Sequence, residues 1–138
     1  MRRFFLLIFT IFFILAIAVP RASTSAQTIL TAGEIIDLVN SIRTSYGLPA
    51  LIVDSILNST AYDTAVTMAN NGVCAHIGGA RERIMAAGFG GGATIYATEN
   101  MACANSATID WLQSVWADAD HMLPMTDPNY THVGAGTY

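Results

Sequence analysis

The chain has 138 residues, of which 53% are hydrophobic and 12% charged, and its basic residues are all arginine. Three of the six arginines lie in the first 26 residues, so the remainder sets three arginines against ten acidic residues, a net charge of −7 with histidine neutral. A domain this acidic lacks the electrostatic footprint of a nucleic-acid-binding protein and the basic patch that holds an anionic membrane surface.

The N-terminus has the order of a secretory signal peptide. Two arginines follow Met1, an apolar run extends from residue 4 to residue 19, and small residues continue to Ala26. The alternative is an uncleaved membrane anchor, but a helix of that run spans only about 24 Å, against about 30 Å for a hydrocarbon core. We therefore expect residues 1–26 to be removed on export. Residues 27–138 then form a single secreted domain.

Two long helices are predicted in the first half of this domain. Thr31 and Glu34 form a capping box, and apolar residues then recur at helical spacing as far as Tyr46. Asp54 is the expected N-cap of a second helix, which carries a stripe of small and apolar residues and ends at Gly72. The alanines in this stripe predict close packing against a neighbouring backbone.

Shorter elements are predicted in the second half. In order they are a helix over residues 80–87 ending at Gly88, a strand over residues 95–97, a helix capped by Ser106, a turn between Pro124 and Pro128, and a strand over residues 130–138. Arg81 and Arg83 look like ordinary exposed residues of the first of these helices. Helices and strands without regular alternation indicate an α+β fold.

The exported domain contains two cysteines, Cys74 and Cys103. An even count in an oxidising compartment is typical of a disulfide bridge. Such a bridge would close a loop of about 30 residues and stabilise the fold by roughly 3–4 kcal/mol in the chain-entropy model. Two buried free thiols are the alternative.

Two of the three histidines, His76 and His121, lie on either side of Glu99 in the sequence. Two imidazoles and a carboxylate are the smallest set that makes an open metal site or an acid–base centre. A divalent metal such as zinc would bind through the two histidines, with Glu99 as a third ligand or as a partner through water. The alternative is that these groups hydrogen-bond one another and order a cleft.

Five segments of the domain follow one another in a familiar order. They are the Asn40–Arg43 helix with the leucine-containing turn after it, the His76 segment with Arg83 and Gly88, residues 98–102 around Glu99, residues 116–121 from Trp116 to His121, and residues 133–136. Together they resemble the CAP superfamily, which comprises the cysteine-rich secretory, antigen 5 and pathogenesis-related proteins. The resemblance is strongest to its short bacterial branch.

The resemblance implies a three-layer α-β-α sandwich around a small antiparallel sheet. It also implies a cleft that holds two histidines and two acids, of which His76, Glu99 and His121 match three. The CAP domain would occupy residues 27–138. Family domains continue past the glycine-rich strand into at least one more strand, so we expect this chain to be C-terminally truncated.

Other residues of the cleft follow from the same resemblance. Asn100 and Trp116 would line it beside the histidines. The second acid has Ser114 in its place, or Asp118 or Asp120 if the register shifts.

A bridge between Cys74 and Cys103 would pin together the two segments that line this cleft. We predict the disulfide on that ground.

The leading functional hypothesis is an exported, non-catalytic binding module. Its cleft would accept a small apolar ligand, a divalent metal or an extracellular partner protein; lipid and sterol binding are roles that the resemblance implies. The sequence contains neither a G-x-S-x-G nucleophile elbow nor an HExxH helix. One alternative is a metal-assisted hydrolase in which His76 or His121 is the general base and Glu99 orients or protonates. Another is a structural or adhesion domain at the cell surface.

Overall fold

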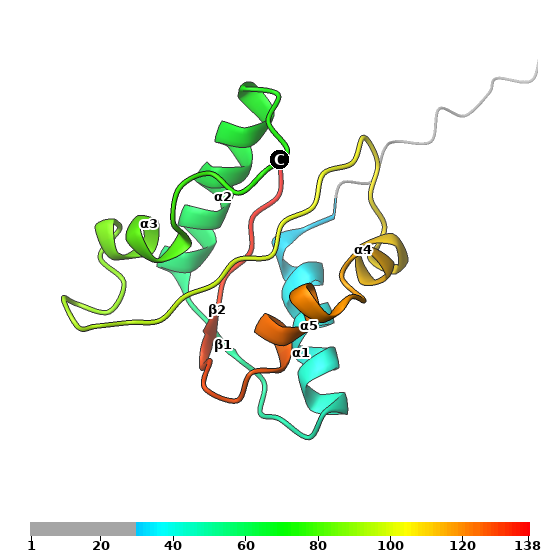
Figure 1. Ribbon diagram of the computed structural model, residues 1–138, viewed down its shortest axis with the longest axis horizontal. Helices are drawn as coiled ribbons and strands as arrows, with labels where there is room; N and C mark the ends of the chain where they lie inside the picture. The colour runs from blue at the N-terminus through cyan, green and yellow to red at the C-terminus, as the bar shows by residue number, and fades with distance from the viewer. Residues whose placement is uncertain (1–29) are drawn as a thin grey trace, which may run out of the picture.

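The computed structural model describes residues 30–138, and the predicted signal peptide lies outside this range. The elements are α1 (Ala32–Ser45), β1 (Ile52–Val53), α2 (Ser55–Asn70), α3 (Ala80–Ala86), α4 (Ile109–Val115), α5 (Ala119–Thr126) and β2 (His132–Val133) (Figure 1). Helices with a small sheet confirm the α+β class. In this range no helix has both the length and the apolarity that crossing a bilayer requires.

The helices form two groups with extended chain between them (Figure 1). α4 and α5 pack against α1, whereas α3 packs against α2. β1 and β2 pair in parallel, with Ile52 opposite His132 and Val53 opposite Val133. The expected antiparallel sheet is therefore wrong for this pair.

The N-caps of α1 and α2 are confirmed. Thr31 Oγ1 accepts the backbone N–H of Glu34 at 3.2 Å, and Glu34 Oε2 accepts that of Thr31 at 2.8 Å. Asp54 Oδ1 accepts the N–H groups of Ile56 and Leu57 at 2.8 and 3.2 Å. Because these bonds satisfy amides that a helix start leaves without partners, both helices begin where the sequence predicts.

Two predicted features of the second half are wrong. Residues 95–97 form no strand, and the chain just after them is held by contacts with side chains instead of by strand pairing. The cap of α4 is Thr108, not Ser106, and its side chain accepts the N–H of Trp111 at 3.2 Å.

α5 also departs from the prediction, which placed a turn at Pro124. Pro124 lies inside the helix, where its ring removes one backbone donor. The helix persists because Asp118 caps its first turn and Met125, only 3% exposed, is buried in the core. The strand expected over residues 130–138 is confined to β2.

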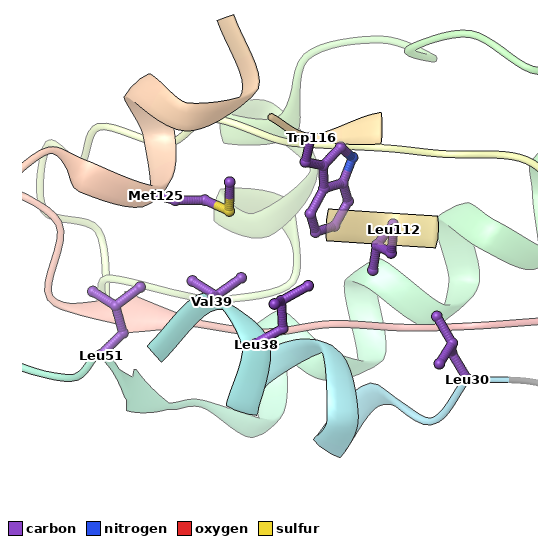
Figure 2. Close-up of a cluster of buried hydrophobic side chains, with 7 residues drawn as sticks. All are labelled: Leu30, Leu38, Val39, Leu51, Leu112, Trp116 and Met125. Carbon is purple, nitrogen blue, oxygen red and sulfur yellow. The ribbon is translucent and has the colours of Figure 1, made fainter. Parts of the chain in front are cut away.

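The core lies between α1, α4 and α5. Figure 2 shows its seven buried side chains, Leu30, Leu38, Val39, Leu51, Leu112, Trp116 and Met125. The Trp116 ring packs within this cluster, and its Nε1–H donates to the carbonyl of Met101 at 3.3 Å. The extended segment that carries Glu99 is thereby tied to the core.

A fully buried arginine joins the ends of several elements. Arg43, on α1, donates from Nε to the carbonyl of Pro49 and from Nη1 to the carbonyls of Met125 and Asp127, at 2.9–3.0 Å. Nη2 donates to the carbonyl of Tyr130 at 3.3 Å. Because Pro49 shortly precedes β1 and Tyr130 shortly precedes β2, both strands start beside the same side chain and run in the same direction, which explains their parallel pairing.

Asn40 holds the same loop one turn earlier on α1. Its Oδ1 accepts the backbone N–H of Leu51 at 2.7 Å, and its Nδ2 donates to the carbonyl of Leu51 at 3.3 Å. This pair of bonds seats Leu51 in the core immediately before β1.

The C-terminal segment runs directly against the backbone of α2. A Cβ added at Gly134 would overlap Leu57, and one at Gly136 would overlap the backbone of Tyr62. The backbone N–H of Ala135, between the two glycines, donates to Asn58 Oδ1 at 2.9 Å. The close packing that the small residues of α2 predicted is thus found on its Leu57–Tyr62 face.

Replacing Arg43 with lysine tests this buried hub. Lysine keeps the charge but has a single ammonium group that cannot reach four carbonyls, so buried acceptors lose their donors. Because hydrogen bonds to charged groups contribute about 1.5–3 kcal/mol each, we expect the free energy of unfolding to fall by at least about 3 kcal/mol in urea titrations followed by circular dichroism.

Arg81→Lys is the matched control, since Arg81 is exposed on α3. It should change the free energy of unfolding by no more than about 0.5 kcal/mol. Equal effects of the two substitutions would contradict the role assigned to Arg43.

Candidate functional site

His76 and Glu99 are brought together from segments more than twenty residues apart. His76 lies in the loop between α2 and α3, and Glu99 lies in the extended chain between α3 and α4. Their side chains meet with Nδ1 of His76 2.8 Å from Oε2 of Glu99. The imidazole is 54% exposed and the carboxylate side chain 21% exposed. In this pair the histidine is therefore accessible to solvent, whereas the acid that it contacts is partly buried.

Arg83 completes this pair from α3. Its Nη2 donates to Oε1 of Glu99, and its Nη1 donates to the backbone carbonyl of Ile77. The prediction that Arg83 is an ordinary exposed residue is wrong, because its side chain is only 23% exposed and forms an ion pair with Glu99. The one sequence signal for it was its place in the family-like segment that begins at His76.

The predicted bridge between Cys74 and Cys103 is confirmed, with Cα atoms 6.1 Å apart. Cys74 precedes His76 by two residues, and Cys103 follows Glu99 by four. Both cysteines are exposed. The bridge thus ties together the segments that carry the His76–Glu99 pair, as expected.

His121 contacts a different acid, Asp118. The two side chains meet with Nδ1 of His121 2.6 Å from Oδ2 of Asp118. The other oxygen of Asp118 accepts the backbone N–H groups of Asp120 and His121 at the start of α5. The pKa of Asp118 is lowered chiefly by the hydrogen bond from the His121 side chain, and to a smaller extent by the bond from the His121 backbone. Of the three candidates for a second acid, Asp118 is therefore the one that contacts this histidine; Ser114 donates to the carbonyl of Trp111 instead.

Asn100 connects the two histidine regions. Its Nδ2 donates to the backbone carbonyl of His121 at 2.9 Å. Since Asn100 follows Glu99 directly, this bond holds the Glu99 segment against the first turn of α5.

Both histidines use the same ring nitrogen toward a carboxylate. An ionised carboxylate only accepts hydrogen bonds, so Nδ1 is the donor in both pairs and Nε2 is left for another partner. Within residues 30–138, no three His, Cys, Asp or Glu side chains gather as a metal site requires. The three-ligand set of His76, His121 and Glu99 stays a prediction.

A large groove of about 1650 Å³ lies between the two helix groups. Most of its lining is small or apolar, including the inner face of α2, the extended segment over residues 94–107 and the C-terminal residues. Arg83, Glu99, Asn100 and Trp116 also line it, whereas His76 and His121 do not. Three of the five residues predicted for the cleft therefore face this space.

The Asp118–His121 pair predicts a pH dependence of stability. A carboxyl whose pKa is lowered by folding stabilises the fold above its unfolded value of 3.8, and this contribution is lost as the pH falls through the lower folded value. We expect Asp118→Ala to lower the melting temperature at pH 7 and the difference from wild type to shrink below about pH 3.8. Differential scanning calorimetry between pH 7 and pH 3 measures it.

Asp120→Ala serves as the control, because the Asp120 side chain accepts no hydrogen bond from His121. Its difference from wild type should stay small and vary less with pH. A constant Asp118→Ala difference across the range would contradict the coupling.

The model of the cysteine-rich secretory protein (CAP) family matches residues 36–138. No curated protein and no solved structure matches the chain significantly. The matched range covers most of the chain and includes the His76–Glu99–Arg83 cluster, the disulfide, the Asp118–His121 pair and the buried Arg43. The chain belongs to the CAP family.

Proposed function

We propose that the protein is an exported CAP-domain binding module whose groove accepts a small apolar or amphipathic ligand. The observation that carries this proposal is the groove itself, which is large and lined mostly by small and apolar residues, as ligand sites are. The Arg83–Glu99 ion pair also lines the groove and supplies charged groups beside the apolar residues. An apolar space with few polar groups at one side binds and orients an amphipathic molecule.

The proposal includes a secreted location. The disulfide supports it, because exposed bridges persist in oxidising compartments and are reduced in the cytosol. The basic, apolar and small-residue order of residues 1–26 and membership of a secretory family support it as well.

The proposal also includes a three-layer sandwich. Two groups of helices, α2 with α3 and α1 with α4 and α5, would cover the two faces of a central extended layer (Figure 1). The ligand would then lie in the middle layer, between the helices.

A charge placed in the groove tests ligand binding. Ala65 of α2 lines the groove, and Ala65→Glu would put a carboxylate among apolar side chains. Because an unpaired charge is costly to bury, we expect the affinity for the neutral fluorescent probe N-phenyl-1-naphthylamine to fall at least about tenfold. Fluorescence titration measures it.

Thr67→Glu is the matched control, because it adds the same charge to the same helix at an exposed position that does not line the groove. It should bind the probe like wild type, with both variants keeping the wild-type circular dichroism spectrum. Equal binding by all three proteins, or none by wild type, would overturn the groove proposal.

Divalent-cation binding is a second candidate, favoured by the histidine geometry. Histidines that bind metal characteristically donate their other ring N–H to a carboxylate or carbonyl. His76 and His121 both have Nδ1 on a carboxylate, which leaves Nε2 for zinc. The alternative of a metal-assisted hydrolase would use the same nitrogens.

Calorimetric titration with zinc alone tests this candidate. We expect His76→Ala to weaken zinc binding at least about tenfold, because it removes one of the two imidazoles. His132→Ala is the control, since His132 is exposed and its Nδ1 contacts the hydroxyl of Thr131 instead of a carboxylate. Equal binding by the two variants would exclude His76 as a ligand.

A further inference from the structure

We infer that Arg83 is a positioning residue that locks the Glu99 carboxylate and thereby fixes His76 in the tautomer with the proton on Nδ1 and a free lone pair on Nε2. Use of that lone pair by a bound cation or ligand rests on the proposed function. The lock itself is a property of the free protein.

Arg83 contacts one member of the pair, Glu99, and the backbone next to the other, His76. One terminal nitrogen donates to Glu99 Oε1, and the other donates to the carbonyl of Ile77, the residue that follows His76. A planar guanidinium fixes the angle between its two terminal donors. The carboxylate and the backbone beside the imidazole are therefore held in one relative orientation.

This orientation assigns the role of each carboxylate oxygen. Oε1 accepts from the guanidinium, so Oε2 is the oxygen left for the imidazole, 2.8 Å from Nδ1. Because an ionised carboxylate offers only acceptors, a neutral imidazole bonded to it carries its proton on Nδ1. An unrestrained histidine side chain in water prefers the opposite tautomer, with the proton on Nε2. His76, which is 54% exposed, has water as the competing partner.

Burial strengthens the arginine side of this arrangement. The side chains of Arg83 and Glu99 are 23% and 21% exposed, so solvent screens their ion pair less than it screens a fully exposed one. Arg83 Nε is buried and has no hydrogen-bond partner in the described part of the chain. The terminal nitrogens bond to Glu99 and to the carbonyl of Ile77, whereas the buried Nε donor stays unsatisfied, which is costly.

The tautomer of His76 shows whether Arg83 positions the His76–Glu99 pair or only stabilises the fold. A purely structural role of Arg83 would leave the tautomer unchanged. Long-range proton–nitrogen correlation spectra of the isotopically labelled full domain, recorded at about pH 9 where imidazole is neutral, identify which ring nitrogen is protonated. Wild type should show the Nδ1–H form. Arg83→Gln should lose most of that form, as should Glu99→Gln, which removes the ionised acceptor. Arg81→Gln on the same helix should keep it.

Arg83→Lys is a second variant that tests the same inference if Arg83→Gln does not fold. Lysine retains the charge but cannot make both fixed contacts, so the Nδ1–H population should fall between wild type and Arg83→Gln. A wild-type tautomer in either folded Arg83 variant would overturn the inference. So would a wild-type protein in which His76 already carries its proton on Nε2.

Zinc titration of the same samples separates this inference from the proposed function. If zinc binds through His76, Arg83→Gln should weaken binding about 10- to 100-fold, as loss of an orienting partner does. The expected tautomers without zinc or probe binding would sink the proposed function and leave the lock standing. If wild type binds zinc or the probe but the tautomer is unchanged in Arg83→Gln, the proposed function stands and the inference about Arg83 fails.

Discussion

The structure depends on a buried cation that is solvated by backbone carbonyls. Arg43 is fully buried, and within residues 30–138 no carboxylate pairs with it. Burying an uncompensated charge is costly, so the carbonyls of Pro49, Met125, Asp127 and Tyr130 must stay in place around it. This requirement fixes the exit of α5 and the starts of both strands relative to α1, and the core in Figure 2 closes around the same junction.

The candidate site lies largely on extended chain, in the segment that carries Glu99. The segment carrying Glu99 has little regular structure, yet it is held at several successive points. Asn100 bonds to the start of α5, the carbonyl of Met101 accepts from Trp116, and Cys103 is joined to Cys74. Arg83 holds the carboxylate itself. A loop can therefore carry a defined site because its own Asn100, a disulfide and the side chains of Trp116 and Arg83 fix it.

Local signals account for what could be predicted from the sequence. The capping box at Thr31, the cap at Asp54 and the apolar periodicity of the first two helices each arise from contacts within a few residues, and all three are confirmed. α5 has a local cap at Asp118, but its continuation past Pro124 could not be predicted, because it depends on burial of Met125, and burial is a tertiary effect. The parallel pairing of β1 and β2 is likewise hidden in the sequence, because Arg43 sets it from a distant helix.

Some features of the candidate site could likewise be predicted from the sequence, and others are set only by the fold. His76, Glu99 and the disulfide follow from the resemblance to a family order, and the structure brings the first two into contact. Arg83 looks like a surface residue in the sequence because its partners, Glu99 and the carbonyl of Ile77, are defined only by the fold. The resemblance groups His121 with Glu99, whereas its contact with Asp118 is local to the first turn of α5.

The disulfide is exposed and lies outside the hydrophobic core. Neither cysteine belongs to the buried cluster in Figure 2, so a reductant can open the bridge without entering the core. Reduction would remove the covalent tie between the loop bearing His76 and the chain bearing Glu99, leaving the hydrogen bonds of His76 and Arg83 to hold Glu99 in place.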